Sequence, residues 1–332
     1  GVLLVGFSGI FFAIKLTSDV YHGWSPEPIA FVGAVSMTVT GLLMFVPLET
    51  FTIGSATSNS LLHVVLPFGV ALGCVFLGVL ARVWDDRDID VSLYPVTVAG
   101  ILVVLTVVFW NFTQRLLSSL ISRVGFSASA TAQTVGEATP PLAEQSAFNF
   151  IYTEYGFAFF TALIAVLVML ARPLVRSDDI RDTGYVVAAL VTVGLIYLAT
   201  PVFEAIAGLF GTSWQIVGLV VSSGLLVGAT FRHRYEASEL YLVVWAAFIT
   251  AAAFTQVRFN YYLAVVVAVF TAIFVAQVFD YLDLRATGES VRESIQDLEG
   301  WQVMIAVAVL LVITVPLLVP FGGSAWATAD RN

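Results

Sequence analysis

Two polar residues of the chain lie where their types could do chemistry. Glu137 lies within residues 127–147, a long stretch of small and polar residues. A carboxylate in such a loop can ligate a divalent cation or accept hydrogen bonds from a substrate, although a plain surface glutamate fits the same pattern. Arg258 lies between two apolar blocks with hardly any loop around it. A guanidinium near bilayer depth is costly, and it can bind a phosphate through two parallel hydrogen bonds. The alternative is that its side chain extends to the membrane surface.

Composition indicates what kind of scaffold must position these residues. Of 332 residues, 59% are hydrophobic and 11% are charged, and the mean hydropathy is +0.95. Soluble domains carry roughly 25% charged residues, so a water-soluble globule is excluded. The one cysteine, Cys74, lies inside an apolar block, which excludes a disulfide framework and a cysteine metal site. The net charge of −9 argues against a nucleic-acid partner. Lys15 is the one lysine. This acidic, lysine-poor balance resembles that of proteins from salt-loving archaea, and a bias in nucleotide composition is the alternative explanation.

The apolar residues occur in blocks of about 20, the length that crosses a bilayer. They predict an all-α integral membrane protein, a polytopic bundle of about ten transmembrane helices with one long external loop. The predicted spans are 1–16 (partial), 27–47, 61–83, 93–116, 148–171, 184–206, 213–231, 238–256, 258–281 and 302–320. Arginines gather in alternate loops and mark the cytoplasmic face; they are Arg82, Arg87, Arg172, Arg176, Arg181, Arg232, Arg234, Arg285 and Arg292. Residues 127–147, the turn at Arg258 and both termini are therefore predicted to be external.

Within this organisation we expect four parts. Residues 1–126 are transmembrane helices that end in an amphipathic segment, 112–126, lying on the external surface because its leucines share one helical face. Residues 127–147 form an external substrate or metal loop, 148–320 are transmembrane helices, and 321–332 begin an external soluble domain. The chain is expected to be the inner part of a longer protein.

Other polar residues have ordinary explanations as well as functional ones. The acidic run at 85–90 contains oxygen ligands for a cation, but we interpret it as an ordinary solvated loop on the cytoplasmic face. Glu154 and Glu204 lie near the external ends of spans and either line a cavity or lie at the interface. The remaining candidates are Asp280, expected to be solvated, and three histidines in different places, which argue against a histidine metal site; these are His22, His63 and His233.

Two local patterns together resemble one family. The stretch from Thr134 to Pro141, Thr-Val-Gly-Glu-Ala-Thr-Pro-Pro, resembles the external-loop motif of oligosaccharyltransferase catalytic subunits. In that motif a small residue, Val or Ile, any residue and Glu are often followed by Glu-x-x-Pro. Gln256-Val257-Arg258-Phe259 is similar to the family's second signature, a Val-Arg pair at the external side of a late span. Both patterns occur in the family's order and on the predicted external face.

The resemblance to archaeal dolichyl-phosphooligosaccharide–protein glycotransferases implies a metal-dependent glycosyltransferase. Such an enzyme moves a glycan from a dolichyl phosphate or pyrophosphate carrier to the asparagine of an N-x-S/T sequon, in the cell membrane and at its external face. By the resemblance, Glu137 is catalytic, helping to bind Mg²⁺ or Mn²⁺ and engaging the acceptor amide, and Arg258 contacts the carrier phosphate. The expected partners are the lipid-linked donor, the acceptor protein and membrane lipid.

The match to the family has departures. Among the motif neighbours Thr134, Val135, Gly136 and Gln256, Gly136 stands where the family often has serine. The interval from Glu137 to Arg258 is 258 − 137 = 121 residues and holds four predicted spans, where close relatives hold two. The family's acidic D-x-D metal motifs are expected before Gly1 and its W-W-D-Y-G acceptor motif beyond Asn332, so the 332-residue chain alone is expected to be inactive.

Three other functions remain open on sequence alone. A membrane glycosyltransferase that uses polyprenyl-phosphate sugars to build lipid-linked glycans would share the multi-span body and the external carboxylates. A transporter of lipid-linked anions would instead place charges near the midplane of several spans, and here the charged residues Lys15 and Glu154 are predicted nearer to span edges. A purely structural membrane subunit is the remaining alternative.

Overall fold

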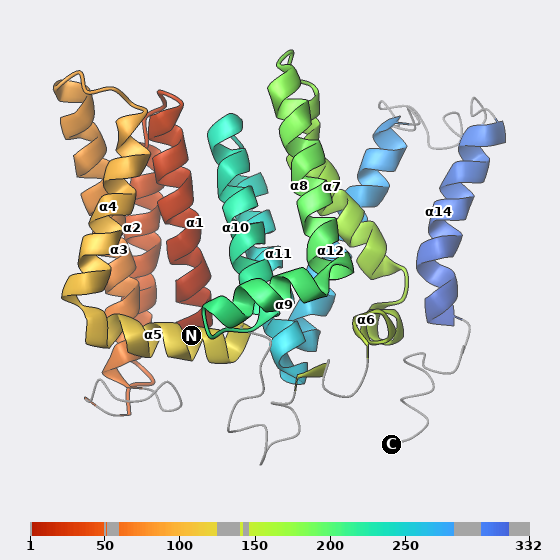
Figure 1. Ribbon diagram of the computed structural model, residues 1–332, viewed down its shortest axis with the longest axis horizontal. Coiled ribbons are helices and arrows are strands. Elements are labelled where there is room, and N and C mark those ends of the chain that lie inside the picture. Colours follow the sequence, from red (N-terminus) through yellow and green to blue (C-terminus); the bar gives the residue numbers. More distant parts are fainter. Residues whose placement is uncertain are drawn as a thin grey trace. The chain divides into compact units, whose positions relative to one another are not determined.

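The computed structural model describes residues 2–49, 51, 60–124, 140–141, 146–281 and 300–318. The elements in this part of the chain are helical, as expected (Figure 1). They are α1 (Val2–Tyr21), α2 (Glu27–Leu43), α3 (Leu61–Asp86), α4 (Leu93–Val108), α5 (Trp110–Val124), α6 (Ala147–Tyr155), α7 (Ala158–Val175), α8 (Ile180–Leu198), α9 (Thr200–Leu209), α10 (Trp214–Arg232), α11 (Ala237–Thr255), the 3₁₀ turn η4 (Val257–Phe259), α12 (Asn260–Tyr281) and α14 (Gly300–Leu318).

Each predicted span overlaps at least one of these helices. A count of about ten membrane crossings is not confirmed. Six helices in the described residues are long and apolar enough to cross a membrane, or seven if the bent pair α8 and α9 forms one span. The six are Leu4–Tyr21, Leu61–Asp86, Ala158–Val175, Trp214–Arg232, Ala237–Thr255 and Val257–Asp280. Helices α2, α4 and the first part of α14 are apolar but shorter.

Three predicted spans are interrupted, each by a local feature of the backbone. The predicted span 148–171 divides at Gly156, whose positive φ of 59° ends α6 before α7 begins. The predicted span 184–206 bends by 83° between α8 and α9, where Pro201 has no N–H to continue the ladder of α8. The predicted span 93–116 ends at Val108, because Phe109 leaves the helical conformation.

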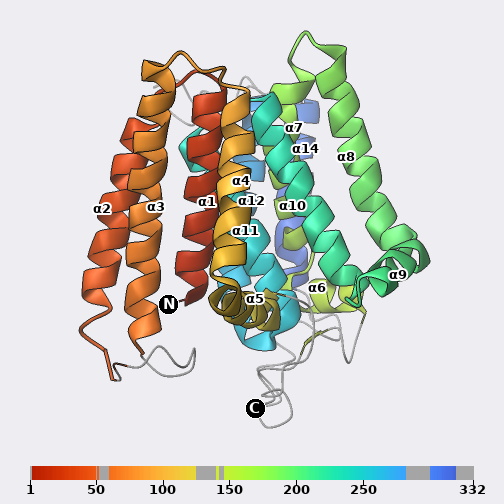
Figure 2. The ribbon, with the colours of Figure 1, turned by 60° about the vertical axis from the view of Figure 1, so that its left-hand side comes forward.

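Helix α5 covers most of the segment predicted to be amphipathic. It runs across the end of α4 instead of continuing along its axis (Figures 1 and 2). Leu117 and Ile121, one helical turn apart, are exposed. That this helix lies on the external membrane surface stays a prediction.

The chain forms two compact units, which we describe separately. The first contains residues 1–125 and 173–248, and the second contains residues 126–172 and 249–332. Helix α1 organises the first unit, since it packs against α2, α3, α4 and α10. The α2–α3 interface is the most extensive, and Figure 2 shows these helices side by side. A Cβ atom at Gly33 would lie 2.7 Å from Cys74 Sγ and 3.0 Å from the Phe12 ring, so only glycine permits this approach.

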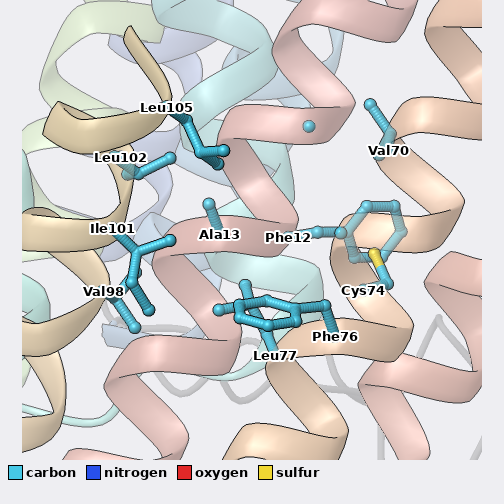
Figure 3. A pocket seen from close by; sticks show the side chains of 12 residues that line it. Phe12, Ala13, Val70, Cys74, Phe76, Leu77, Val98, Ile101, Leu102 and Leu105 are labelled. Atoms are coloured by element: carbon cyan, nitrogen blue, oxygen red, sulfur yellow. The ribbon is translucent and has the colours of Figure 1, made fainter. Parts of the chain in front are cut away.

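A cavity of about 170 Å³ lies between α1, α3 and α4 in the first unit (Figure 3). Its walls are apolar side chains, with Phe12 from α1, Cys74 and Leu77 from α3, and Ile101 and Leu105 from α4. The lining offers no charged or hydrogen-bonding side chain for catalysis, so we do not place the functional site there.

One ionic network, which includes Lys15, is buried in the first unit. The Lys15 and Asp19 side chains are both 2% exposed, and Lys15 Nζ lies 2.7 Å from Asp19 Oδ1. Lys15 Nζ also donates to the Tyr235 carbonyl at 2.8 Å, and Arg234 Nε donates to Asp19 Oδ1 at 2.9 Å. The Arg234 guanidinium lies 3.9 Å from the centroid of a Trp24 ring. These contacts join the end of α1 to the α10–α11 connection.

The second unit is held together by α6, α7, α12 and the end of α11. Phe150, Tyr155, Phe254, Leu263 and Phe270 are buried in its core. A polar contact lies within this core: the hydroxyl groups of Thr161 on α7 and Thr271 on α12 are 3.2 Å apart, and Thr271 also donates to the Ala158 carbonyl at 3.0 Å. The α7–α12 pair therefore has a defined register where it approaches α6.

We expect Asp19→Asn to destabilise the protein by about 3–5 kcal/mol, because it leaves two cations at the network without a carboxylate. The measurement is the free energy of unfolding in detergent, followed by helical circular dichroism. Glu27→Gln is the matched control: its ion pair with Arg82 is exposed, with side chains 55% and 69% accessible, and its loss should cost less than about 1 kcal/mol. Equal losses for the two variants would contradict the buried network's structural role.

Candidate functional site

Arg258 lies at a tight connection between α11 and α12. Helix α11 ends at Thr255, Gln256 is extended with φ −147° and ψ 126°, and η4 follows at once. The Phe259 amide donates to the Gln256 carbonyl at 3.0 Å, and the Asn260 amide donates to the Val257 carbonyl. A single extended residue and one 3₁₀ turn thus connect the two helices, which explains why the sequence shows hardly any loop there.

The local geometry leaves the Arg258 side chain exposed between two buried neighbours. Gln256 and Asn260 are 4% and 8% exposed, respectively. The guanidinium carbon of Arg258 lies 5.2 Å from the centroid of the Phe259 ring. Among the described residues, no carboxylate forms an ion pair with Arg258, in contrast to Arg232 and Arg234. Its planar set of donors is therefore available for an anion.

Asn260 adds a second unsatisfied polar group beside Arg258. Its Oδ1 atom is buried and has no hydrogen-bond partner within the described part of the chain. A buried polar atom without a partner costs roughly 1–3 kcal/mol, so such atoms are rare in stable cores. We call residues 256–260 the arginine turn. It combines the exposed cation of Arg258 with the buried side-chain oxygen of Asn260, which has no hydrogen-bond partner among the described residues.

Helix α6, which follows residues 127–147 in the sequence, borders the same turn. Ser146 caps its first turn, accepting a hydrogen bond from the Asn149 amide at 3.3 Å. At its other end, the Tyr155 hydroxyl donates to the Asn260 carbonyl at 3.1 Å. Burial, with a further contribution from the charge of Glu154, raises the pKa of Tyr155, so the hydroxyl stays protonated as the donor of this bond.

The predicted loop residues lie outside the part that the structure describes. These are Glu137 and its motif neighbours Thr134, Val135 and Gly136. The nearest described residues that follow are Pro140 and Pro141, both buried, and then the cap of α6.

No family model matches the chain. The comparison with curated proteins finds a dolichyl-monophosphooligosaccharide–protein glycotransferase, AglB, of Haloferax volcanii, 42% identical over 96% of this chain. The chain is thus a relative of the archaeal oligosaccharyltransferases. It spans 31% of the length of that relative.

Two solved structures share the fold. An archaeal oligosaccharyltransferase AglB from Archaeoglobus fulgidus, in complex with an inhibitory peptide and a dolichol-phosphate, matches 94% of this chain with a TM-score of 0.62 and 17% identity. An oligosaccharyltransferase of the same organism, tethered to an acceptor peptide containing the NVT sequon, matches 95% with a TM-score of 0.58 and 16% identity. The chain covers 31% and 30% of these proteins. The helical arrangement of an oligosaccharyltransferase is therefore shared over nearly the whole chain.

The structure also places the remaining polar candidates. The run at 85–90 is largely exposed, as expected for a solvated loop, and a hydrogen bond from the Ser92 amide lowers the pKa of Asp90. Glu204 and Asp280 are exposed on α9 and at the end of α12. Glu154 lies on α6, outside the α7 span, and burial raises its carboxyl pKa. No group of three metal-binding side chains occurs among the described residues.

Two of the three histidines lie closer together than the sequence predicts. The sequence places His22 and His233 apart, but in the structure they are close enough for the charge of His22 to affect the pKa of His233. Desolvation, and then the positive charge of His22, lowers the pKa of His233, which follows α10. His63 is at the start of α3. Among the described residues, none of the three histidines belongs to a group of three metal-binding side chains.

Sequence reasoning did not predict that Tyr155 and Asn260 lie together beside Arg258. They are 105 positions apart, and their hydrogen bond uses a backbone carbonyl, which any residue at position 260 would offer. A tyrosine directly before a helix-ending glycine is the one local signal. It identifies the end of α6 but not the partner of the hydroxyl.

Proposed function

We propose that the chain is the membrane part of an oligosaccharyltransferase that transfers a glycan from a dolichyl phosphate or pyrophosphate carrier to the asparagine of N-x-S/T sequons. The observation that carries this proposal is Arg258, an exposed guanidinium without a carboxylate partner among the described residues, at the α11–α12 connection. It occurs in a chain 42% identical to a dolichyl-monophosphooligosaccharide–protein glycotransferase.

In this proposal Arg258 binds the phosphate of the lipid-linked donor. Two parallel N–H···O bonds from a planar guanidinium fix both the position and the orientation of a phosphate. As the bond between glycan and phosphate breaks, negative charge grows on the phosphate oxygens. A cation already in place stabilises that charge without reorganising solvent.

Glu137 is proposed to engage the acceptor asparagine. The amide nitrogen is a poor nucleophile, and a carboxylate that accepts a hydrogen bond from its N–H orients the amide and increases its electron density. Glu137 would also supply one oxygen ligand to Mg²⁺ or Mn²⁺, both of which favour carboxylates. Because the described residues hold no group of three ligands, the other ligands would come from elsewhere. When bound, the metal would supply positive charge near the leaving phosphate.

The proposed topology places this chemistry on the outer face of the cell membrane. About ten helices cross the bilayer, and the loop of residues 127–147 and the Arg258 turn are external. The arginines of the opposite loops, such as Arg176 and Arg234, face the cytoplasm. The donor, the acceptor protein and membrane lipid are the proposed partners.

For the donor site, we expect Arg258→Ala to raise the KM for a dolichyl-monophosphate-linked oligosaccharide about 10–100-fold, as the loss of charge-assisted hydrogen bonds implies. Arg258→Lys should recover part of the lost donor affinity, since lysine keeps the charge and loses the bidentate geometry. The assay is transfer to a fluorescent sequon peptide by a longer form of the protein. Arg176→Ala, an exposed arginine at the end of α7, is the matched control and should behave as the wild type.

For the acceptor site, Glu137→Gln should lower kcat at least 100-fold while donor binding persists, because the amide keeps the size of the side chain and loses its charge. Transfer to the same peptide and donor retention in detergent micelles measure the two effects. Glu204→Gln, an exposed carboxylate on α9, should leave both unchanged. Wild-type turnover in Glu137→Gln would remove Glu137 from the proposed site.

Sidedness can be measured with single-cysteine variants. We expect a membrane-impermeant maleimide applied outside intact cells to label Arg258→Cys and to leave Arg176→Cys unlabelled until the membrane is opened. The native Cys74 is 2% exposed and should contribute little background; any cysteine in a longer form of the protein is replaced first. Labelling of Arg176→Cys in intact cells would overturn the proposed orientation.

A further inference from the structure

Helix α6 holds the arginine turn on both sides. Before the turn, Phe150 packs edge-on against Phe254 of α11, with ring centroids 5.4 Å apart at 79°. After the turn, the Tyr155 hydroxyl donates to the Asn260 carbonyl at 3.1 Å. Phe150, Tyr155 and Asn260 are 1%, 9% and 8% exposed, so both contacts are shielded from water. Arg258 lies between the two points of attachment.

We infer that Tyr155 is a positioning residue for Arg258: its hydroxyl fixes the backbone at Asn260 and so sets where the Arg258 guanidinium meets the phosphate of the lipid-linked donor. This inference rests on the proposed function, because it needs Arg258 to bind that donor. Tyr155 itself does not touch the donor in this inference. It acts through the backbone that connects position 260 to position 258.

The arginine turn needs a restraint from outside because its own hydrogen bonds are weak. A 3₁₀ turn has poorer hydrogen-bond geometry than an α-helix, and η4 consists of only three residues. Its carbonyl and amide groups therefore constrain Arg258 weakly on their own. A hydrogen bond to the first residue of α12 restrains the turn from the side that faces α6.

Tyrosine is suited to this task because its hydroxyl sits on a rigid ring. The Tyr155 ring packs against Phe150 at 6.3 Å and against Phe159 at 6.1 Å between centroids. Gly156, with its positive φ, then turns the chain away from α6 and leaves the Tyr155 side chain at the end of the helix. Figure 1 shows α6 at the same end of the second unit as the first turn of α12.

The hydrogen bond between Tyr155 and Asn260 also connects two parts of the proposed site, because of where α6 lies in the sequence. It is the first helix after residues 127–147, the segment that carries Glu137. The hydrogen bond therefore ties the helix next to the proposed acceptor segment to the turn that carries the proposed donor ligand. Neither residue of the pair needs to react for the tie to affect catalysis.

The test is Tyr155→Phe in a longer, transfer-competent form of the protein. The substitution removes one hydroxyl and keeps the ring contacts. We expect the KM for the dolichyl-monophosphate-linked oligosaccharide to rise three- to tenfold, the effect of one neutral hydrogen bond, while kcat and the KM for a sequon peptide change less than twofold. An unchanged donor KM, or an equal rise in both KM values, would overturn the inference.

Tyr94→Phe is the matched control. The Tyr94 hydroxyl also donates to a backbone carbonyl, that of Leu77, at 2.9 Å, and the residue is fully buried in the first unit. Both variants lose the same kind of bond and should lose similar thermal stability. Only Tyr155→Phe should change the donor KM, and an equal change in Tyr94→Phe would mean that general loosening is the cause.

A double-mutant cycle separates this inference from the proposed function. If Tyr155 acts through Arg258, then Tyr155→Phe has no further effect on the donor KM once Arg258→Ala is present. Effects that multiply would assign Tyr155 a purely structural role and leave the proposed function intact. If Arg258→Ala alone leaves the donor KM unchanged, the proposed function fails, and the positioning role fails with it.

Discussion

The cost of placing unpaired polar groups away from water governs this structure. Most of the helical surface is apolar, so each buried charge needs a partner close by. Lys15 and Asp19 meet this requirement on one helix, one turn apart, and Arg234 completes the network from the α10–α11 connection. The hydroxyl groups of Thr161 and Thr271 meet it in the second unit by bonding to each other and to the Ala158 carbonyl.

Against this background the α11–α12 connection is unusual. Arg258 has no carboxylate partner among the described residues, and the neighbouring Asn260 Oδ1 is buried without a hydrogen bond. In the proposed function, the phosphate of a lipid carrier supplies the negative charge and the acceptor oxygens for Arg258.

A single backbone feature gives the site its supporting helix. Without the positive φ at Gly156, residues 147–175 would continue as one long helix, as the hydropathy pattern predicts. The break frees α6 to lie beside the α11–α12 connection, where Phe150 and Tyr155 reach the two sides of the arginine turn. Phe150 and Tyr155 thus pack into the core of the second unit, and they also contact the residues on both sides of the turn that carries Arg258.

The sequence alone determined the all-helical membrane class and the approximate positions of the helices, because apolar blocks of about 20 residues have few other stable states. It also singled out Arg258, since an arginine between two apolar blocks is conspicuous in one dimension. It did not separate α6 from α7, α8 from α9, or α4 from α5, because hydropathy does not record the backbone dihedral angles at Gly156 or Phe109. Only the tertiary structure decided that Lys15 is fully buried and that Tyr155 bonds to Asn260. Both depend on contacts between residues more than 100 positions apart, which side-chain spacing along one helix does not encode.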